Sequence, residues 1–242
     1  MGGVIFNHTG TVSLINVTAI GNAARGGAGS ASCSTPCGGS GLGAVLFNLN
    51  GNVTIDFSTL AGNMLSGNNL QADAKGPEDG TVYSLAYGNK IQGGSASSAT
   101  LKVRNSIIRG THADGGLQSD VSGNVVNGTN TNTSSLIYAG KNFIGQSYTV
   151  AGVSQSGTSP STVDPLLGAL SLYRSSYLLP VLPIGANSPA KDSASSCLEA
   201  DGSTTLTIDE RGATRPYGSQ CDVGAYEFDG DYIFAANNDV TL

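Results

Sequence analysis

The sequence predicts an all-β protein, a right-handed parallel β-helix (solenoid), on three observations. A sequence block recurs at a fixed spacing, each copy alternates apolar and polar residues with the period of a strand, and the composition suits short strands and turns. Of 242 residues, 35 are Gly, there is no Trp, and only 12% are charged, against about 25% in an average domain. One copy is too small to bury a core, so the copies are expected to stack as coils.

The repeat itself gives the expected register. GGVIFN, continuing as TVSLINVTAIGN to Asn22, aligns without gaps with GAVLFN and NVTIDFSTLAGN, from Gly2 to Gly43, a spacing of 41 residues. A weaker third copy is TLKVRNSIIRGT, residues 100–111. Alternation predicts strands in each copy, because successive side chains of a strand point to opposite faces. The residues expected to point inward are Val12, Leu14, Asn16, Val53, Ile55, Phe57, Leu101, Val103 and Asn105. Those expected to point outward include Ser13, Ile15, Thr54, Asp56, Lys102 and Arg104.

The remaining segments follow from composition. Polar loops are predicted at about 23–41 and 64–80, a less regular coil at 112–148 with strands in SDVSGNVV and SSLIYAGKNFIG, and a Ser/Gly/Thr connector at 149–163. We therefore divide the chain into β-helix coils with loop insertions (1–163), a C-terminal closing module (164–228) and a linker or additional edge strand (229–242). Because Met1 is followed at once by repeat sequence, the chain is expected to be a piece of a longer precursor.

Asn16 and Asn105 occupy equivalent places at a predicted bend. Stacked Asn side chains can form a hydrogen-bonded ladder along a solenoid, and Asn also tolerates turn conformations on its own. Phe57 interrupts the series, so both interpretations stay open.

The C-terminal part carries segments of a different kind. They are DPLLGAL from Asp164, SPAKD from Ser188 to Asp192, DERGATRPYG from Asp209 and CDVGAYE from Cys221 to Glu227. Together with the GGVIFN repeats, these segments resemble the bacterial "choice-of-anchor" β-helix surface proteins, which are similar in style to polymorphic outer-membrane proteins. The sequence departs from that pattern in the extra IGAN before Ser188 and in Lys191. The resemblance implies a β-helix fold and an extracellular or cell-surface location.

A charged cluster lies within this part: Asp192, Asp209, Glu210, Arg211, Arg215, Asp222 and Glu227. We favour a structural role, in which Arg211 and Arg215 bind carboxylates and hold a polar cap over the last coil. Calcium held by Asp209, Glu210, Asp222 and Glu227 is a second interpretation, because carboxylate oxygens suit that ion. Paired carboxylates acting as acid and base are a third. No catalytic residue and no cofactor is assigned.

The four cysteines are expected to form two local disulfides, Cys33–Cys37 and Cys197–Cys221. Their spacings with the two histidines fit no zinc finger. Disulfides indicate an oxidising compartment, hence an exported protein.

The functional prediction is a non-enzymatic extracellular structural or adhesive surface protein that self-assembles head to tail into filaments, with itself or other surface proteins as partners. A net charge of −6 with only 11 basic residues argues against nucleic-acid binding. No apolar run approaches the ~20 residues of a membrane span. The alternative is a polysaccharide-binding or polysaccharide-cleaving β-helix, with Asp56, Lys102 and Arg104 on one outer face; such exposed charges more often form a weak surface ion pair.

Overall fold

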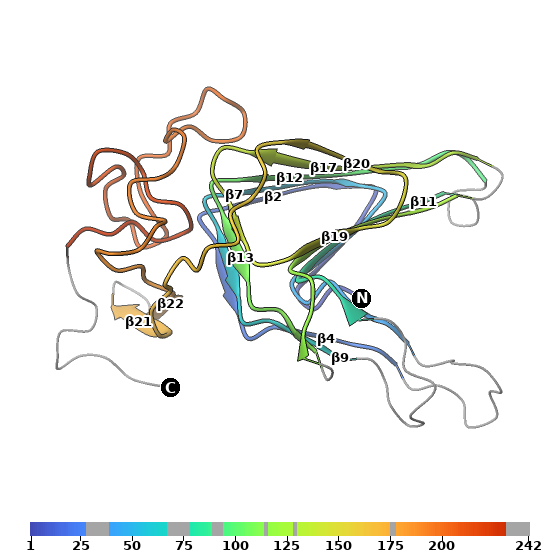
Figure 1. The fold of residues 1–242 in the computed structure, drawn as a ribbon, viewed down its shortest axis with the longest axis horizontal. Helices are drawn as coiled ribbons and strands as arrows, with labels where there is room; N and C mark the ends of the chain where they lie inside the picture. The colour runs from blue at the N-terminus through green and yellow to red at the C-terminus, as the bar shows by residue number, and fades with distance from the viewer. Residues whose placement is uncertain are drawn as a thin grey trace.

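The protein is described here from a computed structural model. The structure describes residues 1–27, 39–66, 78–88, 94–113, 116–127, 130–174 and 178–230. In these ranges all regular structure is β, with no helix, so no helix there could cross a membrane. The prediction of an all-β chain with parallel sheets is confirmed, and the arrangement is consistent with a β-helix or solenoid (Figure 1).

Most strands belong to four sheets in which each turn of the chain contributes one strand. The first sheet contains β1 (Ile5–His8), β6 (Leu46–Leu49), β11 (Val82–Tyr87), β16 (Val121–Val126) and β19 (Ser147–Thr149). The second contains β2 (Thr11–Ile15), β7 (Asn52–Asp56), β12 (Ser98–Arg104), β17 (Thr133–Ala139) and β20 (Val153–Gly157). The third contains β3 (Thr18–Ile20), β8 (Thr59–Ala61), β13 (Ile107–Arg109) and β18 (Phe143–Ile144). The fourth contains β4 (Ala23–Arg25), β9 (Met64–Ser66), β14 (His112–Ala113) and β15 (Gly116–Leu117), the last antiparallel.

Two short pairs complete the strands. β5 (Gly41–Leu42) and β10 (Glu78–Asp79) pair in parallel, and β21 (Ser171–Arg174) and β22 (Leu178–Val181) form an antiparallel hairpin. We call the successive turns coil 1 (β1–β4), coil 2 (β5–β9), coil 3 (β10–β14), coil 4 (β15–β18) and the last coil (β19 and β20).

The register is the one that the repeats predict. Residues of coils 1 and 2 that are 41 positions apart are partners in all four sheets: Ile5 with Leu46, Val12 with Val53, Thr18 with Thr59, and Ala23 with Met64. Val53 is also the partner of Leu101 in coil 3. Equivalent side chains therefore stack at the strand spacing of about 4.8 Å, and the register of all three copies is confirmed.

The core lies inside the coils and consists of these stacked columns. Val53, Ile55, Leu101 and Val103 are at most 2% exposed and belong to one apolar cluster that reaches Leu136 in coil 4. Each such side chain contributes about 1.5–3 kcal/mol through burial. Because every column crosses several coils, each coil completes the core of its neighbours.

Three residues predicted to point inward do not, and the backbone gives the reason. Asn16, Phe57 and Asn105 have φ angles of 54°, 43° and 43°. This left-handed conformation interrupts the alternation of an extended strand. Phe57 accordingly packs with residues of the C-terminal part rather than with the inner cluster, and the two Asn amides also bind there, as described below.

The boundaries of the later coils differ in part from the prediction. The expected strands within 119–126 and 134–145 are confirmed as β16, β17 and β18. The segment 149–163 is not a connector, because β20 pairs with β17 and Ser161 bridges to Phe143. The predicted loops begin with strands, β4 and β9, which pair with each other. Residues 231–242 of the predicted linker lie outside the described residues.

Candidate functional site: a buried charge network beside the coils

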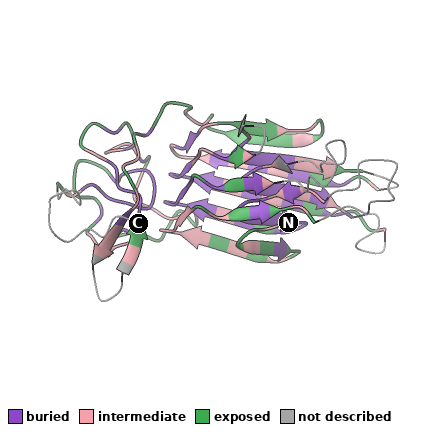
Figure 2. Ribbon diagram, turned by 90° about the horizontal axis from the view of Figure 1, so that it is seen from below, coloured by how far each residue is buried: buried purple, intermediate pink, exposed green. Residues whose placement is uncertain are grey.

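The C-terminal region, residues 164–230, lies beside the stack of coils and not over its end (Figures 1 and 2). Its contacts reach coils 1 to 4. The Asn16 amide donates to Ile208 O at 2.8 Å, Ala225 N–H donates to Thr59 Oγ1 at 3.0 Å, and Phe143 packs in the same apolar cluster as Val181 and Tyr226. This position differs from the predicted cap over the last coil.

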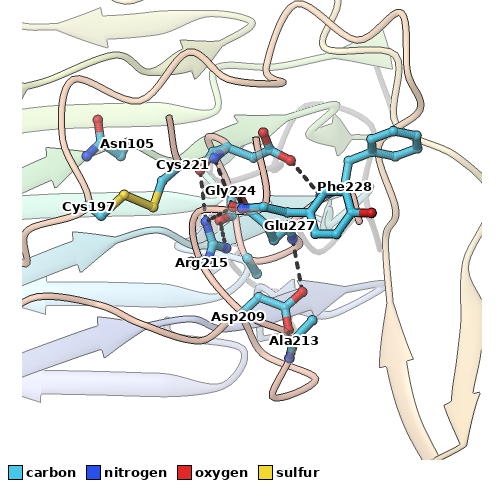
Figure 3. Close-up of polar contacts among 12 residues, drawn as sticks. Asn105, Cys197, Asp209, Ala213, Arg215, Cys221, Gly224, Glu227 and Phe228 are labelled. Carbon is cyan, nitrogen blue, oxygen red and sulfur yellow. Dashed lines mark hydrogen bonds and ion pairs between the residues drawn. A yellow bond between two sulfur atoms is a disulfide. The ribbon is translucent and has the colours of Figure 1, made fainter. Parts of the chain in front are cut away.

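Arg215 and Glu227 form the centre of the network (Figure 3). Their side chains are 0% and 1% exposed, with 3.1 Å between Nη1 and Oε2. Arg215 also donates to the carbonyl oxygens of Asp222 at 2.9 Å and Gly224 at 2.7 Å. Glu227 accepts backbone N–H bonds from Tyr217 and Asp222, both at 2.9 Å. These additional bonds offset much of the cost of burying the ion pair, although Arg215 Nε has no hydrogen-bond partner among the described residues.

Asp209 and Arg211 form a second enclosed pair. Arg211 Nε lies 2.8 Å from Asp209 Oδ2, and the two side chains are 1% and 0% exposed. Asp209 also accepts N–H bonds from Arg211, Ala213 and Glu227 at 2.8–3.0 Å. The Arg211 guanidinium stacks over Tyr226, 3.7 Å from the ring centroid. Asp209 thus joins two backbone segments of the C-terminal region, its own turn and the segment that contains Glu227.

Asp222 and Asp192 bind backbone N–H groups rather than Arg side chains. Asp222 accepts from Asp192 N and Phe228 N, both at 2.6 Å. Burial, together with the neighbouring Glu227 charge, raises the pKa of Asp222 to about 7. Asp192 is the less enclosed carboxylate, and N–H bonds from Gln220 and Ser219 lower its pKa.

The disulfide joins two segments of the C-terminal region close to coil 3 (Figure 3). Cys197 and Cys221 are bonded, with 2.02 Å between the sulfur atoms, which confirms one predicted bridge. Next to it, Gly224 N–H donates to Asn105 O at 2.9 Å, and Phe57 lies under Arg215 at 5.0 Å. Cys33 and Cys37 lie outside the described residues.

The predicted calcium ligands do not converge on a common point. Asp209, Asp222 and Glu227 direct their oxygens at N–H donors, as described above. Glu210 stands apart: its backbone N–H donates to Ala225 O, and burial raises the pKa of its carboxyl to about 7. Over the described ranges, no group of three or more His, Cys, Asp or Glu is placed to hold a metal.

Asn16 and Asn105 bind the C-terminal region and not each other. Asn105 Nδ2 donates to Ser196 O at 3.3 Å, and its Oδ1 accepts from Lys141 N at 3.1 Å. An asparagine ladder does exist at the opposite bend, where Asn7 donates to Asn48 at 2.8 Å and Asn48 to Ser84 at 3.1 Å. Sequence reasoning missed this ladder, although Asn7 and Asn48 are equivalent in the repeats.

The charged residues predicted on an outer face line up as expected but are covered. Asp56 pairs in register with Arg104 and is 0% exposed, while Arg104 is 9% exposed. The C-terminal region lies over them: Lys102 Nζ donates to Ala200 O at 2.8 Å, and Arg104 Nη2 to Ser196 Oγ at 2.6 Å. Burial raises the pKa of Asp56 to about 6. The prediction of a surface ion pair is therefore wrong, because this face is an internal contact.

A separate pocket of ≈ 210 Å³ opens near the bend between the third and fourth sheets, with Arg109, Gln118, Asp120 and Gln146 in its wall. Its carboxylate is already bound: Asp120 accepts from Thr111 Oγ1 at 2.7 Å and from Gln146 N at 2.9 Å.

Comparisons with known proteins returned no relative. No protein-family model matched the chain, and searches of curated proteins and of solved structures found nothing similar.

Proposed function

We propose that this chain is a non-enzymatic structural or adhesive module of an exported surface protein, built as a right-handed parallel β-helix. The observation that carries the proposal is the use made of the C-terminal charges. Asp209, Asp222 and Glu227 are at most 2% exposed and accept N–H bonds from their own region. Groups enclosed in this way hold a fold together and cannot reach a polymer substrate.

The geometry of the coils supports the same proposal. Regular columns and parallel backbone ladders extend in one direction, which suits a stalk or spacer. The right-handed winding rests on the general preference of parallel crossover connections for that hand. Residues 1–163 are then the coil domain, and the residues after 163 a lateral region that fastens the coils to one another.

Location and partners follow from the chemistry of the chain. The Cys197–Cys221 disulfide is stable in an oxidising compartment, so we place the protein outside the cell, as the resemblance to choice-of-anchor β-helix proteins also implies. Its partners would be copies of itself or other surface proteins.

The test is an activity assay combined with proteolysis. Purified protein is incubated with a panel of acidic and neutral polysaccharides, and new reducing ends are measured beside a polysaccharide lyase as positive control. We expect no new ends, and we expect the coils to resist a broad-specificity protease. New reducing ends that disappear in an Asp209→Asn or Glu227→Gln variant would replace the structural role with an enzymatic one.

A further inference from the structure

The two ends of the coil stack share a property that the middle lacks. Residues 1–24, in coil 1, and residues 142–163, around the last coil, contain no Asp, Glu, Lys or Arg, and His8 is their one titratable imidazole, although the whole chain has a net charge of −6. Arg25, at the end of β4, is the charged side chain of coil 1, and the other charged residues belong to the later coils and to the C-terminal region. Two ends with so little charge repel each other weakly.

Both ends also present strand edges. In the part of the chain that the structure describes, β1, β2 and β3 are terminal strands of their sheets at one end, and β19 and β20 are terminal at the other. An edge strand offers unpaired N–H and C=O groups to another chain. The C-terminal region leaves these edges open, because it lies at the side of the stack (Figure 2).

Coil 1 is the apolar end. Leu46, Ile55 and Leu60 of coil 2 are 0% exposed. Their counterparts in coil 1, among them Ile5 and Leu14, are only partly buried against the same cluster. A further coil stacked on coil 1 would cover these side chains, as coil 2 covers them on the opposite side.

An aromatic column on the outer face of the first sheet identifies what could provide that coil. Phe6, Phe47 and Tyr83 are in register and stack, with ring centroids 5.7 Å and 5.4 Å apart. The same register continues to Ser122, which ends the aromatic column in coil 4, and then to Tyr148 in the last coil. Phe6 is 50% exposed and Tyr148 is 52% exposed, so a half-exposed aromatic ring occupies this register position at both ends of the stack.

We infer that a second copy of this chain docks head to tail, with coil 1 of one copy stacked on the last coil of the next and Phe6 placed against Tyr148. The contact would extend the parallel ladders and the aromatic column across the junction without a change of register. It rests on the proposed structural function and names the partner of that function. Because the two surfaces differ, the contact does not close and builds a filament.

Two single substitutions test the inference by complementation. Phe6→Asp places a charge at the first end, and Tyr148→Asp places one at the last end. Association of each purified full-length variant is followed by sedimentation velocity over a wide concentration range, with far-UV circular dichroism to confirm the fold. Phe6→Ser and Tyr148→Ser form a milder pair if an aspartate disturbs folding. Tyr217→Asp is the control, because Tyr217 is 61% exposed on the C-terminal region.

We expect the parent and Tyr217→Asp to form species that grow with concentration, and each end variant alone to stay monomeric. An equimolar mixture of the two end variants should form a heterodimer, because each retains the end that the other has lost. Dimers of Tyr148→Asp alone would show that coil 1 binds coil 1 and would overturn the head-to-tail contact. A parent protein that stays monomeric throughout would overturn it as well.

The polysaccharide assay on the same samples separates this inference from the proposed function. A monomer that releases no reducing ends contradicts only the end-to-end contact. A chain that releases reducing ends contradicts the structural role, whatever its state of association.

Discussion

The coils and the C-terminal region bury similar kinds of surface by different means. The coils use columns of Val, Leu and Ile in a register that repeats from coil to coil, after 41 residues between the first two coils. The described residues of the C-terminal region form one regular element, the β21–β22 hairpin, and the region is held by a disulfide and enclosed ion pairs. Repetition distributes stability over many equivalent residues, whereas the irregular region depends on a few specific ones. Substitutions should therefore be tolerated differently in the two regions.

The largest effect should come from the centre of the irregular region. Arg215→Ala removes a guanidinium that binds Glu227 and the carbonyl oxygens of Asp222 and Gly224. Removing one partner of a buried pair leaves the other charge uncompensated, at a cost of about 3–5 kcal/mol. We expect a loss of that size in the free energy of unfolding measured with urea.

The matched control is Arg25→Ala, because Arg25 is exposed on β4 in coil 1, and its removal should change the free energy of unfolding by less than about 0.5 kcal/mol. Retention of the coil signal in circular dichroism, with loss of protease resistance only after residue 164, would show that the two regions unfold separately. If Arg215→Ala lowers the free energy of unfolding by no more than the control does, the ion pair does not stabilise the C-terminal region.

The boundary between the two regions should respond to pH. Burial under the C-terminal region raises the pKa of Asp56 from 3.8 to about 6, against the opposing effect of Arg104. Between these values the folded chain holds a proton that the unfolded chain has lost, so stability falls as the pH rises from about 4 to about 6 and then levels off. The shift corresponds to roughly 2–3 kcal/mol. Glu210 and Asp222, both raised to about 7, act in the same direction.

Asp56→Asn isolates the contribution of this one carboxyl. The variant keeps the shape of the side chain without its charge, so at pH 8 it should be more stable than the parent, while at pH 4 the two should agree within about 1 kcal/mol. Urea midpoints measured from pH 4 to pH 8 provide the comparison. A variant that is less stable than the parent at pH 8 would show that Asp56 is ionised and stabilised by Arg104 and Lys102.

The same contrast explains what the sequence could and could not predict. Repeats fix which residues are partners, so the pairing of Val12 with Val53 and of Val53 with Leu101 followed from alignment alone. Alternation fails where the backbone leaves the extended conformation, and Phe57, with φ of 43°, therefore turns toward the C-terminal region. The position of that region depends on contacts between residues far apart in the chain, such as Asn16 and Ile208. No local pattern encodes such contacts, and Asp56 consequently looked exposed.

The smallest changes in the free energy of unfolding are expected for two asparagine variants. One asparagine belongs to the ladder between coils, and the other contacts the C-terminal region. Asn48 is fully buried and donates to Gly51 O at 2.9 Å and Ser84 Oγ at 3.1 Å, besides accepting from Asn7. Asn48→Ala leaves these buried partners unsatisfied and should lower the free energy of unfolding by about 2 kcal/mol.

Asn16 is half-buried, and its side-chain amide donates one hydrogen bond, to Ile208 O. Asn16→Ala should therefore lower the free energy of unfolding by about 1 kcal/mol or less. Urea unfolding of both variants measures the difference, and Asn22→Ala, which removes a part-buried bond to Asn63 at 3.2 Å, provides an intermediate case. If Asn16→Ala proves the more costly, the first coil depends more on the C-terminal region beside it than on the coil stacked above it, and the stack would not be the independent unit that its repeats imply.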